Sequence, residues 1–434
     1  MQNIKKFESR VRSYSRAFPV TFKLAKDAYL YDEQDNAYLD FLCGAGSINY
    51  GHNNEEIKKK VIDYLDNDGI VHGLDLATTA KEEFLKTFQS LILEPRSFHY
   101  KIQFTGPTGT NAVEAALKLA RKVTGRTNII SFTNGFHGVS LGPLAATGNS
   151  GHRGGSGVPL NNVTFMPYDG YFGNKSNTID YIRRFLEDTS SGVDLPAAFI
   201  VETIQGEGGI NVAKDSWLRS LYELCKEFEI LLIADDIQVG CGRTGSFFSF
   251  EHSGIPPDMV VLSKSLSGFG LPFSLLLLKP ELDVWKPGEH NGTFRGNNLA
   301  FVSATETLKK YWSTQKFESE ISKKSQLLKS ELERIVRKYL SPDMEVRGKG
   351  LIFGVDCRSP DLAKQLADRA FENRLILERC GSEDQVVKFM PPLTADIETI
   401  EAGLRIFEKS VAQLSSNPEI QLEIKKGVNK TDRT

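Results

Sequence analysis

The sequence predicts an α/β protein in which helices cover both faces of a largely parallel sheet, followed by a smaller α+β domain. Short apolar runs alternate with amphipathic stretches over residues 100–262, which is typical of a doubly covered parallel sheet. The 434 residues are enough for one large domain and one smaller one. Polar residues also follow the expected strands, at the edge where such sheets bind ligands. These residues are Thr105, Glu202, Asp235 and Lys264.

The elements of the first two thirds of the chain follow from local patterns. Alternating apolar residues predict a small antiparallel sheet over 22–42 with a turn at 33–36, and glycines predict a loop over 44–51. A helical pattern begins at Asn54 and runs to about Asp66. In the large domain we expect strands at 100–105, 128–132, 197–202, 230–233 and 259–262, and helices at 111–123 and 216–228.

The last third predicts a second, smaller domain. A long helix is expected from Leu299 towards Tyr339, with a break near 312–316. A β-containing region follows, with strand-like segments at 344–357, 374–380 and 385–390 and a helix at 359–373. We therefore divide the chain into an N-terminal segment that packs with the small domain (1–55), a large domain (56–310), a C-terminal small domain (311–415) and a polar, disordered tail (416–434).

Composition excludes several classes of partner. Charged residues make up 25% of the chain and the net charge is −2, so we expect neither nucleic acid nor a membrane surface as a partner. The apolar run Ser274–Leu278 is too short to span a bilayer, and the charged N-terminus does not fit a signal peptide. We expect a cytoplasmic enzyme. The five cysteines form no CxxC pair and the seven histidines no ligand spacing, so no metal site is expected.

Lys264 and Asp235 are the central candidate residues. A pyridoxal phosphate enzyme needs an amine and a carboxylate, and here each lies at the carboxyl end of an expected buried strand. The amine forms a Schiff base with the cofactor, and the acid keeps the pyridine nitrogen protonated. The alternatives are a solvated lysine and a turn capped by Asp235 and Asp236. Adjacent acids point in opposite directions on a strand, so at most one of the two can face a cofactor ring.

Three further segments supply candidate contacts for such a cofactor. In FTGPTGTNAVEAALKLARKV, the small residues Gly109 and Thr110 open a helix whose N-terminus suits a phosphate; the alternative is an ordinary capped helix. Phe136 in NGFHG fits a ring-stacking role, although core packing also explains it. Gln238 can donate a hydrogen bond to a phenolic oxygen. Thr293 lies in the polar segment GEHNGTFRGNN, which also reads as a surface turn.

Together these motifs resemble the class III pyridoxal phosphate aminotransferases of fold type I. LLIADDIQVGCGRTGSFF is similar to the family's LLIADEVQTGFGRTG signature, and the similarity covers nearly the whole chain. The resemblance implies a large domain with a mostly parallel seven-stranded sheet between helices. Longer passages, such as GIVHGLDLATTAKEEFL and WKPGEHNGTFRGNNLAF, resemble the diaminobutyrate aminotransferases of ectoine biosynthesis. They imply transfer of an amino group from L-glutamate to L-aspartate 4-semialdehyde, giving L-2,4-diaminobutyrate and 2-oxoglutarate.

The resemblance also assigns residue roles. Lys264 resembles the Schiff-base lysine, Asp235 the partner of the pyridine nitrogen, and Thr293 a residue that reaches a neighbouring subunit's phosphate. A homodimer or higher homo-oligomer is therefore implied, with small amino acids and oxo-acids or semialdehydes as the other partners. The implied cofactor contacts are Gly109, Thr110, Phe136, His137, Asp235, Gln238, Lys264 and Thr293.

The sequence departs from the family where substrate carboxylates are held. Ornithine-type members carry an arginine at the position of Val139, and many members carry one at Lys388, opposite Glu207. Lysine lacks the planar fork that grips a carboxylate, so Glu207 and Lys388 are only candidate substrate contacts. Cys43 and Ser47 stand where we expect small residues near the substrate, so a substrate that differs from the family's stays an open alternative.

Other functions also stay open at this point. The first is another class III ω-aminotransferase, acting on 4-aminobutyrate, ornithine or a related diamine. The second is diaminobutyrate supply for a siderophore or a peptide. A catalytically silent protein with the pyridoxal phosphate fold is the third, and the presence of both Lys264 and Asp235 argues against it.

Overall fold

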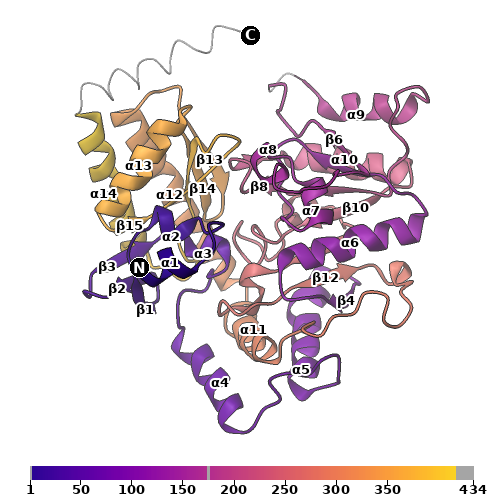
Figure 1. Cartoon of the computed structure of the whole chain (residues 1–434), viewed down its shortest axis with the longest axis horizontal. Coiled ribbons are helices and arrows are strands. Elements are labelled where there is room, and N and C mark those ends of the chain that lie inside the picture. The colour runs from indigo at the N-terminus through magenta and orange to yellow at the C-terminus, as the bar shows by residue number, and fades with distance from the viewer. Residues whose placement is uncertain (1, 174–175, 417–434) are drawn as a thin grey trace.

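The largest element of the protein is a seven-stranded sheet. The structure is a computed structural model, which describes residues 2–173 and 176–416. The strand order in the sheet is β4-β12-β11-β10-β7-β5-β6, and β12 alone runs antiparallel to its neighbours (Figure 1). The strands are β4 (Lys101–Phe104), β5 (Ile129–Phe132), β6 (Val163–Met166), β7 (Ala198–Val201), β10 (Leu231–Asp235), β11 (Met259–Leu262) and β12 (Leu275–Leu278).

The central strands are apolar throughout because both faces of the sheet are covered. In β11, Val260 and Leu262 belong to one hydrophobic cluster, whereas Met259 and Val261 belong to another on the opposite face. Alternate residues of a strand point to opposite faces, so a strand buried on both sides needs apolar residues at every position. This arrangement confirms the predicted largely parallel sheet between helices.

Helices of the large domain pack on both faces of the sheet. Helix α6 (Gly109–Thr124) contributes Ala116 to one cluster, and α10 (Asp215–Glu227) contributes Leu221 to the other. The remaining helices of this part are α4 (Glu55–Asp66), α5 (Thr79–Phe88), α7 (Leu141–Ala146), α8 (Ser150–Arg153), α9 (Thr178–Glu187) and α11 (Asn298–Tyr311). Single turns of 3-10 or π-helix occur at Gln89–Leu93, Glu94–Arg96, Glu251–Ser253, Lys264–Ser267 and Pro280–Leu282.

The N-terminal strands and the C-terminal part of the described chain lie together beside the large sheet (Figure 1). Strand β3 near the N-terminus pairs in parallel with β15 near the C-terminus, Leu39 lying opposite Leu375. Two four-stranded sheets result, with orders β1-β2-β3-β15 and β13-β14-β17-β16. Their strands are β1 (Phe22–Lys26), β2 (Tyr29–Asp32), β3 (Ala37–Asp40), β13 (Glu345–Lys349), β14 (Ile352–Asp356), β15 (Leu375–Ile376), β16 (Glu378–Cys380) and β17 (Val386–Phe389).

Helices and a short hairpin complete the structure. Helix α12 (Lys316–Tyr339) contacts α14 (Ile397–Ser415), and α13 (Pro360–Glu372) also packs on α14. The elements not yet named are α1 (Gln2–Phe7), α2 (Tyr14–Ala17), α3 (Cys43–Gly46), β8 (Ile204–Gln205) and β9 (Asn211–Val212). None of the helices within residues 2–173 and 176–416 combines the length and the apolar character that crossing a membrane requires.

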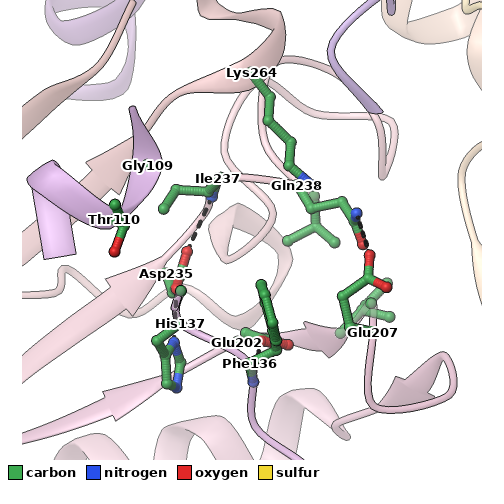
Figure 2. A pocket seen from close by; sticks show the side chains of 14 residues that line it. Gly109, Thr110, Phe136, His137, Glu202, Glu207, Asp235, Ile237, Gln238 and Lys264 are labelled. Carbon is green, nitrogen blue, oxygen red and sulfur yellow. Dashed lines mark hydrogen bonds and ion pairs between the residues drawn. The ribbon is translucent and has the colours of Figure 1, made fainter. Parts of the chain in front are cut away.

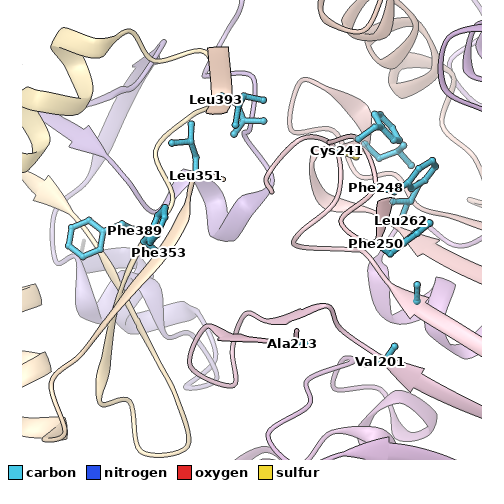
Figure 3. Close-up of a cluster of buried hydrophobic side chains, with 14 of the residues drawn as sticks. Val201, Ala213, Cys241, Phe248, Phe250, Leu262, Leu351, Phe353, Phe389 and Leu393 are labelled. Carbon is cyan, nitrogen blue, oxygen red and sulfur yellow. The ribbon is translucent and has the colours of Figure 1, made fainter. Parts of the chain in front are cut away.

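A single hydrophobic cluster joins the large sheet to the C-terminal sheet. Phe250 and Leu262 on one side and Phe353 and Phe389 on the other belong to the same cluster (Figure 3). The fully buried Arg243 bridges the same two regions. Its guanidinium donates to the carbonyl oxygens of Leu351 and Pro391, at 2.8 and 2.6 Å.

Most predicted elements form close to their predicted bounds. The helix break near 312–316 is confirmed, because α11 ends at Tyr311 and α12 begins at Lys316. Strands β6 and β12 were not predicted. The proposed tail lies, apart from residue 416, outside the described residues, and the division of the chain at 55, 310 and 415 stays a prediction.

Candidate active site

A cavity of about 180 Å³ lies at the carboxyl edge of the large sheet. Residues that follow β4, β5, β7, β10 and β11 meet there, although they are far apart in sequence (Figure 2). This confirms that the polar residues at the strand ends share one edge of the sheet. The cavity is lined by Gly109, Thr110, Phe136, His137, Gly138, Glu202, Ile204, Gly206, Glu207, Asp235, Ile237, Gln238, Val239 and Lys264.

Asp235 is fixed in the cavity by two hydrogen bonds. Its Oδ2 lies 2.6 Å from Nδ1 of His137, and its Oδ1 accepts from the backbone N–H of Ile237 at 3.2 Å (Figure 2). The next residue, Asp236, points away from the cavity and accepts hydrogen bonds from the backbone N–H and the hydroxyl of Ser249. The expectation that only one of the two acids faces the cavity is therefore confirmed.

Glu202 is a second buried acid beside Asp235. Burial raises the pKa of Glu202 well above its ordinary value, and the charge of Asp235 raises it further. The raised pKa favours the neutral, protonated form of Glu202, in which it adds no second negative charge to the cavity. Its Oε1 accepts from the backbone N–H of Phe136 at 3.1 Å.

Lys264 reaches into the cavity from the turn that follows β11. Its backbone φ is 48°, in the left-handed region that a residue with a side chain seldom occupies. Its Nζ donates to the carbonyl oxygen of Ala45 at 2.8 Å. Ala45 lies in another left-handed turn, where Cys43, Gly44 and Ala45 have φ values of 54°, 57° and 54°. Burial lowers the pKa of Lys264, which increases the fraction of neutral amine.

Glu207 connects the cavity to a buried charge cluster. Its Oε1 accepts from Nε2 of Gln238 at 2.9 Å and from Nζ of Lys388 at 2.8 Å. Lys388 is completely buried and also forms an ion pair with Glu378 at 2.8 Å. Burial alone would raise the pKa of Glu207, but Lys388 and Lys264 outweigh burial and lower it to about 2. Glu207 is therefore ionised.

The N-terminus of α6 forms one wall of the cavity. No side chain caps this helix, and its first residues, Gly109 and Thr110, line the cavity. Gly109 packs directly against Ile237, because a Cβ added at Gly109 would lie 2.9 Å from Cδ1 of that side chain. An uncapped helix N-terminus with a glycine in its first turn is well suited to bind a phosphate.

The cavity fits the pyridoxal phosphate that the sequence predicts. Within the described part of the chain, Oε2 of Glu202 and Oε1 of Gln238 are buried without a hydrogen-bond partner, and both residues line the cavity. Buried polar atoms without partners are rare, and a bound polar ligand supplies the missing ones. The amine of Lys264, the carboxylate of Asp235 and the α6 N-terminus lie around the same space, as an aldehyde, a pyridine nitrogen and a phosphate require.

The predicted site residues line the cavity, apart from Lys388 and Thr293. Lys388 lies behind Glu207, and Thr293 is exposed in the segment before α11. A contact of Thr293 with a neighbouring subunit stays a prediction. Both amide hydrogens of Gln238 are used, one by Glu207 and one by the carbonyl of Ala45. A bond from Gln238 to a phenolic oxygen therefore requires one of these contacts to break.

The residues expected near the substrate do not line this cavity in the described structure. Val139 is 59% exposed. Cys43 is buried and Ser47 bonds to the carbonyl of Gly44, and neither is among the residues that line the cavity in the described structure. Burial raises the pKa of the Cys43 thiol to about 12, which makes it unreactive.

Glu378 was not identified from the sequence. Its side chain lies 2.8 Å from Lys388, and its Oε1 accepts a hydrogen bond of 2.6 Å from the hydroxyl of Tyr14. Glu378 and Lys388 stand opposite each other in the β16–β17 pair. Only the register of that pair brings them together, and no spacing in the sequence indicates it.

Comparisons with known proteins identify the family. A model of the aminotransferase class-III family matches residues 11–411. A diaminobutyrate--2-oxoglutarate transaminase from Bordetella parapertussis is 56% identical over 422 residues, 97% of this chain and 97% of its own. The protein of the same name from Halalkalibacterium halodurans is 53% identical over 423 residues, 98% of this chain and 99% of its own.

Solved structures agree with this match. Ornithine aminotransferase from Toxoplasma gondii superposes with a TM-score of 0.81 at 25% identity, over 96% of this chain and 94% of its own. An S-selective transaminase from Arthrobacter sp. shares the fold, with a TM-score of 0.83 at 20% identity over 96% of this chain and 97% of its own. The family match and the relatives that are more than half identical show that this chain belongs to the class III aminotransferases.

Proposed function

We propose that the protein transfers an amino group from L-glutamate to L-aspartate 4-semialdehyde, giving L-2,4-diaminobutyrate and 2-oxoglutarate. The observation that carries this proposal is the similarity, over almost the full length, to relatives named diaminobutyrate--2-oxoglutarate transaminase. The cavity supports it by grouping an amine, a carboxylate and an uncapped helix N-terminus. Supply of the product to ectoine biosynthesis stays a prediction from the sequence.

Lys264 is the proposed proton carrier. Class III aminotransferases use pyridoxal 5'-phosphate, which supplies an aldehyde for amino groups and a protonated ring that withdraws electrons. A lysine must be neutral to accept a proton, and the burial of Lys264 favours this form. The carbonyl of Ala45 holds its Nζ at 2.8 Å and leaves the amine a lone pair with which to accept a proton. We assign Lys264 as the base that takes the proton from the substrate carbon and returns it.

Asp235 is the proposed partner of the pyridine nitrogen, and His137 positions it. A carboxylate must stay ionised to stabilise a positive ring nitrogen. His137 and the N–H of Ile237 hold the Asp235 oxygens, which would fix the carboxylate beside the ring nitrogen.

The remaining proposed contacts orient the cofactor. Gly109 and Thr110 at the start of α6 would hold the phosphate, and Phe136 would stack on the ring. We further propose that Thr293 reaches the phosphate of a neighbouring subunit. A homodimer is then the smallest functional unit.

A substrate assay tests the proposed function. Purified holoenzyme is mixed with L-glutamate and L-aspartate 4-semialdehyde, and diaminobutyrate is quantified by chromatography. The reverse direction compares diaminobutyrate, 4-aminobutyrate and ornithine as donors to 2-oxoglutarate. We expect diaminobutyrate to have the highest kcat/KM, and the Lys264→Ala variant, as the negative control, to be inactive. A higher kcat/KM for 4-aminobutyrate or ornithine would overturn the proposal.

A further inference from the structure

The cluster of Glu207, Lys388 and Glu378 contains two acids and one base. Burial disfavours a charged Lys388, but the two glutamates outweigh burial and raise the pKa of Lys388 well above its ordinary value. Both acids lie 2.8 Å from its Nζ. Tyr14 donates a hydrogen bond to Oε1 of Glu378, and Oε2 of Glu378 is the atom that lies 2.8 Å from the Lys388 ammonium. Two negative charges thus share one positive charge, and the cluster is negative overall.

Only Glu207 presents this charge to the cavity. Its side chain is 28% exposed, whereas the side chains of Lys388 and Glu378 are 0% and 8% exposed. Glu207 lines the cavity and the other two do not. A ligand therefore meets a carboxylate here, with the lysine ammonium enclosed behind it.

Glu207 is linked to the reacting end of the cavity through short hydrogen bonds. Nε2 of Gln238 donates to Glu207 and to the carbonyl oxygen of Ala45, at 2.9 and 3.1 Å. Nζ of Lys264 donates to the same carbonyl oxygen. A substrate of a few carbon atoms whose amine reacts at Lys264 can therefore place a second polar group beside Glu207.

We propose that Glu207, with Lys388 and Glu378 behind it, binds the non-reacting α-ammonium group of the diamino acid, and that Glu378 is a specificity-determining positioning residue. This inference rests on the proposed function. A Glu207–Lys388 pair alone would be neutral and would attract neither charge. The second carboxylate makes the subsite negative, so it attracts an ammonium group and repels a carboxylate.

Two amine donors isolate the effect of the α-ammonium. 4-Aminobutyrate is diaminobutyrate without its α-amino group, and both react through the same terminal amine. The charge of Glu378 should therefore matter only for diaminobutyrate. The experiment measures kcat/KM of the holoenzyme for each donor with 2-oxoglutarate, in the wild type and in Glu378→Gln.

The expected result is that the enzyme discriminates less between diaminobutyrate and 4-aminobutyrate. In Glu378→Gln, kcat/KM for diaminobutyrate should fall about tenfold, which corresponds to about 1.4 kcal/mol, and kcat/KM for 4-aminobutyrate should stay equal or rise. Glu378→Asp, which keeps the charge, should retain most of the preference. The matched control is Glu345→Gln, because Glu345 pairs with Arg347 away from the cavity and is 54% exposed. This control should leave both values unchanged.

The results that overturn the inference are distinct from those that overturn the function. An equal fall in kcat/KM for both donors in Glu378→Gln indicates a structural role. Unchanged kcat/KM values for both donors show that Glu378 has no role in specificity. Either result overturns the inference alone. A wild-type enzyme that prefers 4-aminobutyrate overturns the proposed function and the inference together. If Glu378→Gln does not fold, Glu378→Met decides, because it removes the same charge and keeps the length of the side chain. A ratio of kcat/KM for the two donors that is unchanged in Glu378→Met would overturn the inference.

Discussion

Asp235 and Lys264 come together because their strands are neighbours in the sheet. Strands β10 and β11 pair in parallel, with Asp235 opposite Val261, and Lys264 follows three residues after Val261. The carboxylate and the amine therefore enter the cavity from adjacent strand ends. Alternation along β10 turns Asp236 the other way, into the core beside Ser249. Two adjacent acids thus have different environments and different proposed roles.

The first prediction concerns Asp235. In Asp235→Asn, no negative charge faces the ring nitrogen, so we expect the protein to fold and kcat to fall by at least about a hundredfold, as for loss of one strong electrostatic contact in an active site. Single-turnover absorbance changes of the bound cofactor with glutamate measure the effect. Asp236→Asn is the matched control and should retain most of the activity. A near-normal rate in Asp235→Asn would remove the proposed electronic role.

The second prediction concerns Asp236 and pH. Burial raises the pKa of Asp236 to about 7. A raised carboxyl pKa means that its contribution to stability is present below the unfolded-state pKa and is lost as pH rises through about 7. Between about pH 5 and pH 8 the free energy of unfolding of the wild type should therefore fall by on the order of 2 kcal/mol more than that of Asp236→Asn.

Thermal unfolding of both proteins across this pH range tests the sign. The wild-type Tm minus the variant Tm should fall as pH rises. A difference that is constant or grows with pH would show that Asp236 is ionised throughout. Comparing the two proteins cancels the titration of all the other groups that they share.

At the scale of elements, the cavity depends on turns that adopt unusual backbone conformations. Lys264 and the segment 43–45 both have positive φ, and the hydrogen bond from Nζ of Lys264 to the carbonyl of Ala45 joins the two turns. Such conformations cost about 1–3 kcal/mol for a residue with a side chain and persist only where the surroundings enforce them. Lys264 follows β11 of the large sheet, and the segment 43–45 follows β3, which pairs with β15, so both turns are attached to sheets.

At the scale of the whole molecule, Arg243 connects three parts of the chain. It follows β10, donates to Oδ1 of Asn49 at 2.6 Å in the N-terminal segment, and donates to the carbonyl oxygens of Leu351 and Pro391 near the C-terminus. Its side chain is completely buried. A guanidinium can satisfy acceptors in several directions at once, which a lysine ammonium on a flexible chain cannot do in the same geometry.

The third prediction tests this connection. Arg243→Lys should lower the free energy of unfolding by about 3 kcal/mol, because buried acceptors lose their partners. Denaturant unfolding measures the change. Arg334→Lys is the control: Arg334 pairs with Glu408 at the surface and is 42% exposed, so its loss should cost less than about 1 kcal/mol. Equal effects of the two variants would contradict the proposed role of Arg243.

Much of the fold follows from local patterns. The helix at α4 was predicted from a helical pattern that begins at Asn54, and the structure shows that the side chain of Asn54 caps this helix by accepting from the N–H of Ile57. Strand β12 was missed because Leu275–Leu278 is a uniform apolar run with no period to distinguish a strand from another buried segment. Its place between β4 and β11 depends on pairing with strands far away in sequence.

Patterns along the chain are enough to predict the family, the sheet with helices on both faces, and the residues that meet at its carboxyl edge, Lys264 and Asp235 among them. Apolar runs and strand-end residues are local patterns, and parallel strands bring their ends to one edge. The enclosure of Lys388 between Glu207 and Glu378, and the hydrogen bond from Tyr14 to Glu378, could not be predicted in this way. Strand register and the packing of the N-terminal segment on the C-terminal strands set these contacts, and no local spacing encodes either of them.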